Sequence, residues 1–308
     1  MEIFAQQLAN GLILGSIYAL IALGYTMVYG ILGLINFAHG EVTMMGAMLS
    51  ITLLNVLLNI AGLPPALCIG ITLLITLPAC MLLGVGIERI AYRPLRNAPR
   101  LAPLITAIGV SIVLQNVAMM IWGRGYQRFP DILSTQPFSF MHASLTPTKV
   151  AIVLVSALVL SGLWLLVNRT PLGRAMRATA QDSQVAQLMG VNINRVIAAT
   201  FAIGSALGSL AGFLVAAIYA KADPYMGFML GLKAFSAAVL GGIGNLAGAV
   251  IGGLLLGLIE SFGAGYIGEL TGGVLGSNYQ DIFAFLVLVS VLVLKPSGLL
   301  GKNTVERA

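Results

Sequence analysis

The chain has 308 residues, of which 58% are hydrophobic and 8% are charged, and its formal net charge is +6. Soluble globular proteins carry about 25% charged residues, so a water-soluble enzyme cannot be built from this composition. The basic excess does not indicate a nucleic-acid partner, because Lys and Arg stand in short breaks between long apolar runs, as in membrane proteins. The composition therefore predicts an all-α, polytopic integral membrane protein in contact with lipid.

Nine segments have the length and apolar character of membrane helices, which need about 20 residues to cross the hydrocarbon. The first predicts a retained span rather than a secretory signal, because no basic residue precedes it. The predicted spans, some of them broken, are 8–32, 40–60, 66–88, 101–122, 149–168, 196–219, 229–243, 245–263 and 279–296. We expect a bundle of about eight to ten membrane helices in a single domain, 1–308, with a possible repeat of two halves at about 1–150 and 151–308.

The basic residues define the expected orientation, because Lys and Arg collect on the cytoplasmic side of membrane proteins. Segments 89–100, 169–195 and 295–308 hold 11 of the 16 basic residues, and the order of the spans places all three on one side. We expect that side to be cytoplasmic, with the C-terminus there and segment 123–148 on the opposite side.

Two places interrupt the apolar pattern and predict helices that break at membrane depth. Asn36, His39 and Glu41 lie close together within apolar sequence, and four glycines occur within eight residues that include Asn245. Gly costs about 1 kcal/mol relative to Ala within a helix. Broken helices in corresponding places of two halves indicate a transport pathway.

These polar residues allow two interpretations. In the first, His39 and Glu41 lie in an interfacial turn and stabilise the start of the next helix, where the dipole favours a carboxylate. In the second, Asn36, His39, Glu41 and Asn245 face the translocation path, because ionisable residues within spans are rare and usually functional. No metal site is indicated, since His39 and Glu41 are two residues apart and would point to different faces of a helix.

Two glycine-rich stretches, 204–212 and 252–257, place small residues about four positions apart. Such spacing lets helices approach closely in lipid. The pattern therefore predicts helix packing at both stretches, and no chemistry is assigned to them.

The polar segment 169–195 has helix-capping residues at both ends. Thr170 precedes a proline, which makes a good helix start. Gly190 is a suitable C-terminal cap, and Asn192 or Asn194 can cap the next span. The segment predicts one short helix along the membrane surface, or two helices broken near Asp182.

Two faces of this predicted helix differ in character. One face carries a mainly apolar row, which consists of Leu172, Met176, Thr179, Ala186 and Met189. Another face carries the polar residues Arg174, Arg177, Gln181 and Gln184. Such a helix can lie in the headgroups, anchored by its arginines, or it can dock a cytoplasmic partner, and composition does not distinguish the two.

Four stretches of the chain resemble a known family. They are 24–47 (GYTMVYGILGLINFAHGEVTMMGA), 88–96 (ERIAYRPLR), 173–192 (GRAMRATAQDSQVAQLMGVN) and 233–253 (KAFSAAVLGGIGNLAGAVIGG). In order and over nearly the whole chain, they are similar to the LivH-type permease of high-affinity branched-chain amino-acid ABC transporters. The resemblance implies a permease subunit of an ATP-driven importer that carries aliphatic amino acids across the bacterial inner membrane. Urea, short amides or other amino acids are alternative substrates.

The same resemblance implies partner subunits. They are a second, homologous permease, two ATP-binding subunits and a periplasmic substrate-binding protein, and no nucleic acid is implied. In this family the loop that corresponds to 173–192 is where an ATPase subunit docks. The residues expected to couple ATP hydrolysis to transport are Arg174, Arg177, Asp182, Ala186 and Gly190.

The sequence contains no ATP site of its own. A phosphate-binding loop needs Gly-Lys-Ser/Thr, whose amides and lysine bind phosphate and whose hydroxyl reaches magnesium. Of the five lysines only Lys302 follows a glycine, and Asn303 comes next. We therefore expect no catalytic residue and no cofactor in this chain, with ATP–Mg bound by the partner subunits.

Two further classes of function are weaker alternatives. An ion-coupled secondary transporter needs ionisable residues buried in mid-span, whereas Glu41 and Glu260 lie near predicted span ends. A membrane hydrolase needs a nucleophile and a base in register, and the two histidines and scattered serines offer no recognisable arrangement.

Overall fold

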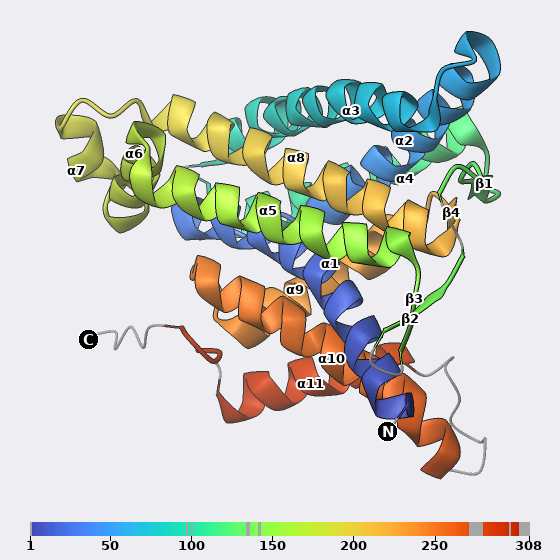
Figure 1. The fold of residues 1–308 in the computed structure, drawn as a ribbon. Helices are drawn as coiled ribbons and strands as arrows, with labels where there is room; N and C mark the ends of the chain where they lie inside the picture. Colours follow the sequence, from blue (N-terminus) through green and yellow to red (C-terminus); the bar gives the residue numbers. More distant parts are fainter. Residues whose placement is uncertain are drawn as a thin grey trace. The chain divides into compact units, whose positions relative to one another are not determined.

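Helices dominate the computed structural model, which describes residues 2–96, 98–99, 101–133, 136–140, 143–270, 280–295 and 297–301 (Figure 1). Apolar runs form helices because only a helix or a closed barrel satisfies the backbone polar groups of a chain in lipid. The α-helices are α1 (Glu2–Leu32), α2 (His39–Ala61), α3 (Pro65–Ile87), α4 (Leu101–Trp122), α5 (Pro147–Arg169), α6 (Pro171–Gln181), α7 (Ser183–Leu188), α8 (Ile193–Tyr219), α9 (Met226–Gly241), α10 (Leu246–Leu270) and α11 (Gln280–Leu294).

Shorter elements connect these helices. A π-helical turn, η1 (Glu88–Tyr92), and a 3₁₀ turn, η2 (Arg93–Leu95), prolong α3 into the segment that the sequence predicts as a loop. Four short strands, β1 (Gln127–Arg128), β2 (Phe138–Phe140), β3 (Ala143–Leu145) and β4 (Lys221–Ala222), form two antiparallel pairs, β1 with β4 and β2 with β3.

The observed helices confirm the predicted polytopic helical membrane protein. Within the described residues, seven helices are long and apolar enough to cross a membrane, and Met226–Gly241 and Asp281–Leu294 are shorter apolar helices. These helices correspond to the nine predicted spans. Their limits differ most at the start of α1 and the end of α10, because hydrophobicity marks the lipid-covered part of a helix and not the turns beyond it.

The chain forms two compact units. Unit 1 comprises Met1–Thr26, Ser134–Ala157 and Leu232–Ala308, and unit 2 comprises Met27–Leu133 and Leu158–Gly231. Helices α1, α5 and α9 therefore contribute residues to both units. The possible two-half repeat stays a prediction.

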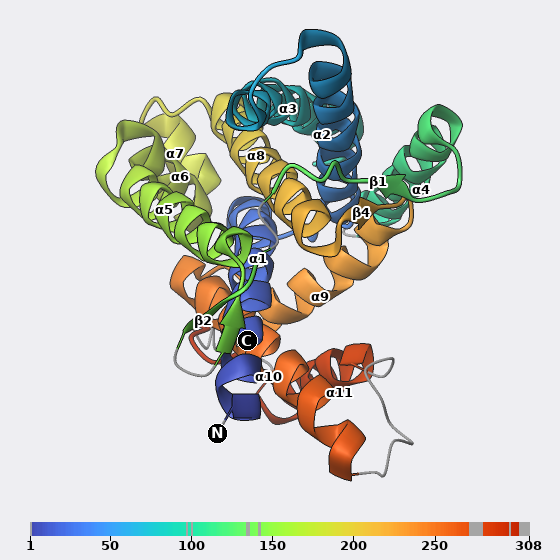
Figure 2. The same ribbon diagram turned by 45° about the vertical axis from the view of Figure 1, so that its right-hand side comes forward.

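In unit 2, α8 lies beside α2 and α3 (Figures 1 and 2). A Cβ atom at Gly46 of α2 would lie 2.5 Å from the Cα atom of Ser209, and one at Gly212 would collide with the carbonyl oxygen of Thr43. The close packing predicted for stretch 204–212 is thus confirmed, because the missing side chains bring the two backbones into contact.

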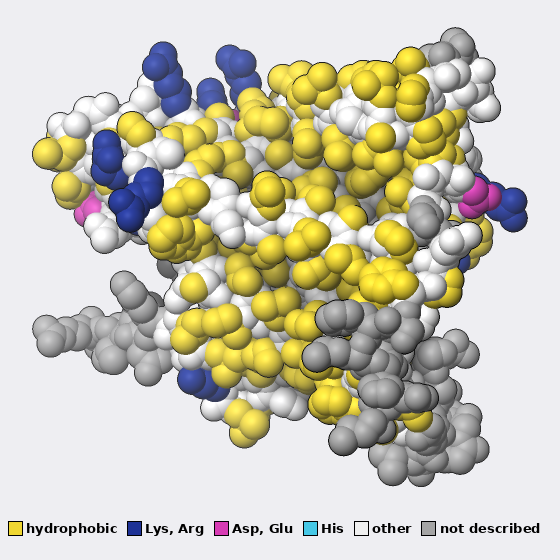
Figure 3. Space-filling view, viewed as in Figure 1, with side chains coloured by type: hydrophobic (Ala, Val, Ile, Leu, Met, Phe, Trp, Pro, Cys, Tyr) yellow, Lys and Arg dark blue, Asp and Glu magenta, His cyan; other side chains and the backbone are white. Residues whose placement is uncertain are grey.

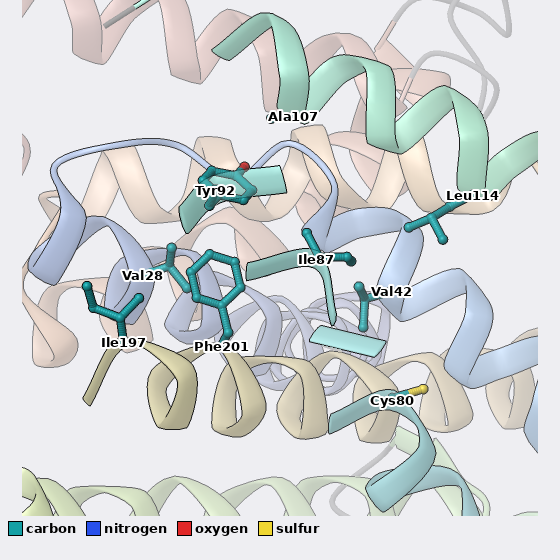
Figure 4. Close-up of a cluster of buried hydrophobic side chains, with 9 residues drawn as sticks. All are labelled: Val28, Val42, Cys80, Ile87, Tyr92, Ala107, Leu114, Ile197 and Phe201. Atoms are coloured by element: carbon teal, nitrogen blue, oxygen red, sulfur yellow. The ribbon is translucent and has the colours of Figure 1, made fainter. Parts of the chain in front are cut away.

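A cluster of buried hydrophobic side chains in unit 2 joins α3, α8 and η1 to α2, α4 and the end of α1 (Figure 4). The aromatic rings of Tyr92 and Phe201 both belong to this cluster, 5.2 Å apart between centroids and tilted by 56°. Tyr92 and Phe201 are each 2% exposed. The π-helical turn is therefore anchored on α8 by aromatic packing.

Unit 1 repeats the glycine-based packing between α1 and α10. A Cβ atom at Gly253 would lie 2.5 Å from the backbone nitrogen of Ala19, and one at Gly257 would collide with the backbone of Gly15. A Cβ atom at Gly252 would collide with the carbonyl oxygen of Ala237 in α9. Stretch 252–257 is therefore a packing surface, as predicted.

Candidate functional site

The break between α1 and α2 is organised by Asn36. Gly33 ends the preceding helix with a φ of +65°, a conformation that glycine adopts without strain. The Oδ1 atom of Asn36 accepts hydrogen bonds from the Ala38 N–H at 3.2 Å and from the Tyr92 hydroxyl at 2.9 Å, and its carbonyl accepts the His39 N–H at 3.0 Å. The predicted break is thus observed, and Asn36 determines its shape.

His39 and Glu41 follow directly in the first turn of α2 and are 2% and 1% exposed. His39 lies against α8, since a Cβ atom at Gly208 would be 3.3 Å from its Cε1 atom. Glu41 faces α4, where its Oε1 atom accepts a hydrogen bond from the Ser111 hydroxyl at 3.1 Å. The two side chains point to different faces of the helix, as the sequence spacing predicts.

The second carboxylate oxygen of Glu41 faces the first turn of α9. A Cβ atom at Gly227 would lie 2.5 Å from this Oε2 atom, and one at Gly40 would collide with the carbonyl oxygen of Gly227. Among the residues that the structure describes, Oε2 has no hydrogen-bond partner. Glu41 therefore stands between the N-terminal turns of two helices, a position in which the helix dipoles favour a carboxylate.

The second break lies in unit 1, between α9 and α10, and its local geometry resembles the first. Gly242 has a φ of +105°, and the Oδ1 atom of Asn245, three residues later, accepts the Gly248 N–H at 3.2 Å. The Asn245 amide also donates to the carbonyl oxygen of Leu300 at 2.9 Å. Asn245 thus caps α10 and holds the segment that follows α11.

The polar segment after α5 forms two helices that meet at Asp182, one of the two arrangements that the sequence allows. The Thr170 hydroxyl accepts the Gly173 N–H at 3.1 Å and caps α6. The Asp182 carboxylate accepts the N–H groups of Gln184 and Val185, at 2.9 and 3.0 Å, and caps α7. Gly190 ends the segment with a φ of +86°. The predicted caps are therefore observed.

The bend at Asp182 separates the residues of the predicted apolar row. Met176, Thr179 and Ala186 are 4%, 3% and 4% exposed, whereas Met189 is 81% exposed. One continuous helix would have kept all four on one face. The bend rotates α7, so that Leu188 and Met189 point outward.

Arg174 and Arg177 lie on the outer side of α6, and both are exposed. The guanidinium of Arg177 also donates a hydrogen bond to the carbonyl oxygen of Val167, in the last turn of α5, where a cation is favoured. Figure 3 shows Lys and Arg side chains at the α6 end of unit 2 and a mainly hydrophobic surface along α5 and α8. The visible face of unit 2 thus has charged side chains at both ends, near α6 and near β1, and apolar sides between them.

A buried charge cluster in unit 1 is absent from the sequence-based candidates. The Lys233 ammonium of α9 lies 2.6 Å from a Glu260 carboxylate oxygen of α10 and 2.6 Å from an Asp281 oxygen of α11. The Tyr18 hydroxyl of α1 donates to the second oxygen of Glu260 at 2.8 Å. The side chains of Lys233 and Glu260 are 8% and 0% exposed.

The cluster corrects the expected position of Glu260, which lies well inside α10 rather than near a span end. Lys233 and Glu260 are the charged residues of an otherwise apolar stretch, 226–268. Their isolation in the sequence could have predicted the ion pair, because a charge in an apolar membrane stretch requires a partner.

Known proteins resemble the chain over nearly its whole length. The profile of the family described as branched-chain amino acid transport system / permease component matches residues 7–292. The chain is 45% identical to the high-affinity branched-chain amino acid transport system permease protein BraD of Pseudomonas aeruginosa, over 99% of this chain and 98% of the relative. It is 42% identical to the high-affinity branched-chain amino acid transport system permease protein LivH of Escherichia coli strain K12, over 99% of this chain and 97% of the relative. A more distant relative is the ribose import permease protein RbsC of the same strain, 27% identical over 77% and 74%.

The fold defines a polytopic helical membrane protein. The chain belongs to the family of permease components of branched-chain amino acid transport systems.

Proposed function

We propose that this chain is the membrane-spanning permease subunit of an ATP-driven importer of branched-chain amino acids in the bacterial inner membrane. The observation that carries the proposal is the near full-length identity of 45% and 42% to BraD and LivH. The chain is also 27% identical to a ribose import permease, so distantly related chains carry chemically different solutes. Distant similarity therefore does not by itself define the substrate. Other amino acids, urea and short amides are the alternative substrates.

The proposed assembly contains a second permease, two ATP-binding subunits and a periplasmic binding protein. ATP and magnesium bind to the ATPase subunits, because this sequence has no phosphate-binding loop. In this assembly α6 and α7 face the cytoplasm and dock an ATPase subunit, and the C-terminus lies on the same side. The caps at Thr170, Asp182 and Gly190 support this role, because a docking element must be rigid to transmit a displacement.

The docking contact would be made by the outward face of α7. Val185, Leu188 and Met189 are 53%, 86% and 81% exposed. Ala186 is buried, so it supports this face from within and does not reach a partner. Arg174 and Arg177 would flank the contact, with Arg177 also bound to the end of α5.

The translocation path would pass the first break. Glu41 supports this assignment because it is a buried carboxylate between the starts of α2 and α9. Gly40 and Gly227 meet there without side chains, so the two helix starts can separate without breaking side-chain packing between these glycines. Asn36 and His39 would shape the path from the same turn. Asn245 is the corresponding candidate in unit 1, where it caps a helix after a glycine turn.

The buried Lys233–Glu260 pair is the feature that an ion-coupled transporter would require. Here the Lys233 ammonium contacts two carboxylates, and Glu260 also accepts the Tyr18 hydroxyl, so the buried Lys233 and Glu260 both have partners within unit 1. Such a satisfied cluster supports helix packing and leaves ATP as the proposed energy source.

The decisive experiment is transport by the purified complex in proteoliposomes. We expect this chain, expressed with a second permease, two ATPases and a binding protein of the same kind of transport system, to form a complex that accumulates radiolabelled leucine only with ATP and binding protein. Dissipating the ion gradients with ionophores should leave uptake unchanged. The Glu41→Gln variant should keep its ATPase subunits and lose uptake, while the exposed Asn168→Ala variant, outside the docking element, serves as a control for assembly.

Three results would each overturn one part of the proposal: the energy source, the substrate or the role of Glu41. Uptake that needs an ion gradient and proceeds without ATP would identify a secondary transporter. A complex that hydrolyses ATP in response to ribose or urea, and not to leucine, would keep the importer class and replace the substrate. Normal uptake by Glu41→Gln would return that residue to a helix-stabilising role.

A further inference from the structure

The segment Glu88–Arg96 contains three kinds of helical turn in succession. The Glu88 N–H still bonds to the Gly84 carbonyl, as in an α-helix, but the Arg93 N–H bonds to the Glu88 carbonyl, five residues back. A 3₁₀ turn follows at Arg93–Leu95. Single π-helical turns are rare and frequently lie at functional sites. The segment is part of the ERIAYRPLR stretch, which has no function in the docking or translocation proposed above.

One end of this segment is bound to the start of α8. The Glu88 carboxylate is fully buried and pairs with Arg93, at 3.3 Å, and with Arg96. A second nitrogen of Arg96 donates to the Asn194 side-chain oxygen at 2.6 Å. Asn194 lies in the first turn of α8, four residues after Gly190 ends the α6–α7 segment. The arginine therefore connects the π-helical turn to the chain that leaves the proposed docking element.

The other attachment of the segment is to the break between α1 and α2. The Tyr92 hydroxyl donates to the Asn36 side-chain oxygen at 2.9 Å, and the same oxygen accepts the Ala38 N–H. The Tyr92 ring packs on Phe201 of α8 (Figure 4). Tyr92 thus touches both the break and α8.

Helix α8 holds the segment at two points, Asn194 and Phe201, which are two turns apart. At 1.5 Å per residue these points are about 10 Å apart along the helix. A tilt or rotation of α8 must therefore move Arg96 and Tyr92 together, or break one of their hydrogen bonds. Packed elements of this kind change between discrete arrangements instead of deforming continuously.

We propose that the segment Glu88–Arg96 couples the docking element to the membrane break, with Arg96 and Tyr92 as positioning residues. The inference rests on the proposed docking of an ATPase at α6 and α7. A displacement of that element reaches α8 through Gly190 and Asn192, passes to Arg96 through Asn194, and reaches Asn36 through Tyr92. The turn that presents His39 and Glu41 then changes shape in step with the ATPase.

The test uses two substitutions that each remove one hydrogen bond and keep the packing. Tyr92→Phe retains the ring on Phe201 and leaves the Ala38 N–H bonded to Asn36. Asn194→Ala removes an exposed side chain. The matched controls are Tyr225→Phe, whose exposed hydroxyl bonds to Met119, and Asn168→Ala, whose exposed amide bonds to its own helix.

The measurement is the number of leucine molecules imported per ATP hydrolysed by the complete complex in proteoliposomes. In both test variants we expect normal recovery of ATPase subunits and sustained hydrolysis, with about fivefold less import per ATP, the population shift that one hydrogen bond of average net strength produces. The controls should keep the parental ratio. The double variant should lose no more than the worse single variant, because both bonds belong to one path.

Normal import per ATP in either test variant would overturn this inference and leave the proposed function intact. A double variant whose loss equals the product of the two single losses would also overturn it, because independent sites behave in that way. Failure of the parental complex to bind ATPase subunits would overturn the proposed function, and this inference with it.

Discussion

At the scale of single residues, Lys233 is a buried charge whose stability depends on its carboxylate partners. Its side chain is 8% exposed and contacts carboxylates on two other helices. Removing one member of a buried ion pair costs about 3–5 kcal/mol, because the remaining charge is left without a partner. Replacing both members with uncharged groups of similar shape is far less harmful. Losing one member of the ion pair therefore destabilises the protein more than losing both members.

We predict that Lys233→Met lowers the thermal stability of the purified protein in detergent, because it leaves the Glu260 carboxylate buried without its cation. Lys233→Met combined with Glu260→Gln should recover most of the loss, since glutamine can still accept the Tyr18 hydroxyl. The measurement is the temperature at which the protein leaves the monodisperse fraction in size-exclusion chromatography. Lys221→Met, at an exposed lysine, is the control. A double variant as unstable as the single one would show that charge pairing is not the cause.

At the scale of elements, α6 and α7 differ from the membrane helices because their sequence carries a clear polar and apolar face. The structure divides these faces at Asp182, so that α6 buries Met176 while α7 exposes Leu188 and Met189. Large apolar side chains exposed next to each other commonly mark an interaction surface. The element therefore combines internal packing with an outward contact face.

We predict that Leu188→Ser together with Met189→Ser reduces co-purification of the ATPase subunits and leaves the folded permease intact. Burial of one such side chain on a partner is worth about 1.5–3 kcal/mol, whereas an exposed ion pair is worth about 0–1 kcal/mol. Arg174→Ala should therefore cause a smaller loss. Recovery of the ATPase per permease, measured on purified complexes, checks the order. Equal recovery for the double serine variant and the parent would reduce α7 to an element that anchors the loop.

At the scale of the whole molecule, the distribution of basic residues decides the expected orientation in the membrane. Arg89 and Gln184 are exposed residues of the basic segments, and Arg124 is exposed in the segment expected on the opposite side. All three belong to unit 2. They therefore test the orientation of one compact unit.

We predict that Arg89→Cys and Gln184→Cys resist an impermeant thiol reagent in intact cells and react after permeabilisation. Arg124→Cys should react in intact cells. The native cysteines, Cys68 and Cys80, are buried and should contribute little background. Labelling of the first two variants from outside, with protection of the third, would invert the assigned topology.

The sequence by itself determined which segments are helices, where they break and how their ends are capped. Apolar runs, the glycines before Asn36 and Asn245, and the caps at Thr170, Asp182 and Gly190 act through neighbours within a few residues, so a local pattern predicts them. Their positions in the structure follow that pattern closely. The same holds for stretches 204–212 and 252–257, because small residues at helical spacing favour close contact whichever helix is the partner.

Only the tertiary structure decided which side chains meet across the fold. Glu260 accepts from Tyr18, 242 residues away, and Arg96 contacts Asn194, 98 residues away. The sequence could not predict these pairs, because membrane helices are apolar toward lipid and toward each other, so that hydrophobicity does not fix their rotation. The exposure of Met189 and the burial of Ala186 depend in the same way on the bend at Asp182 and on how α7 rests against α8.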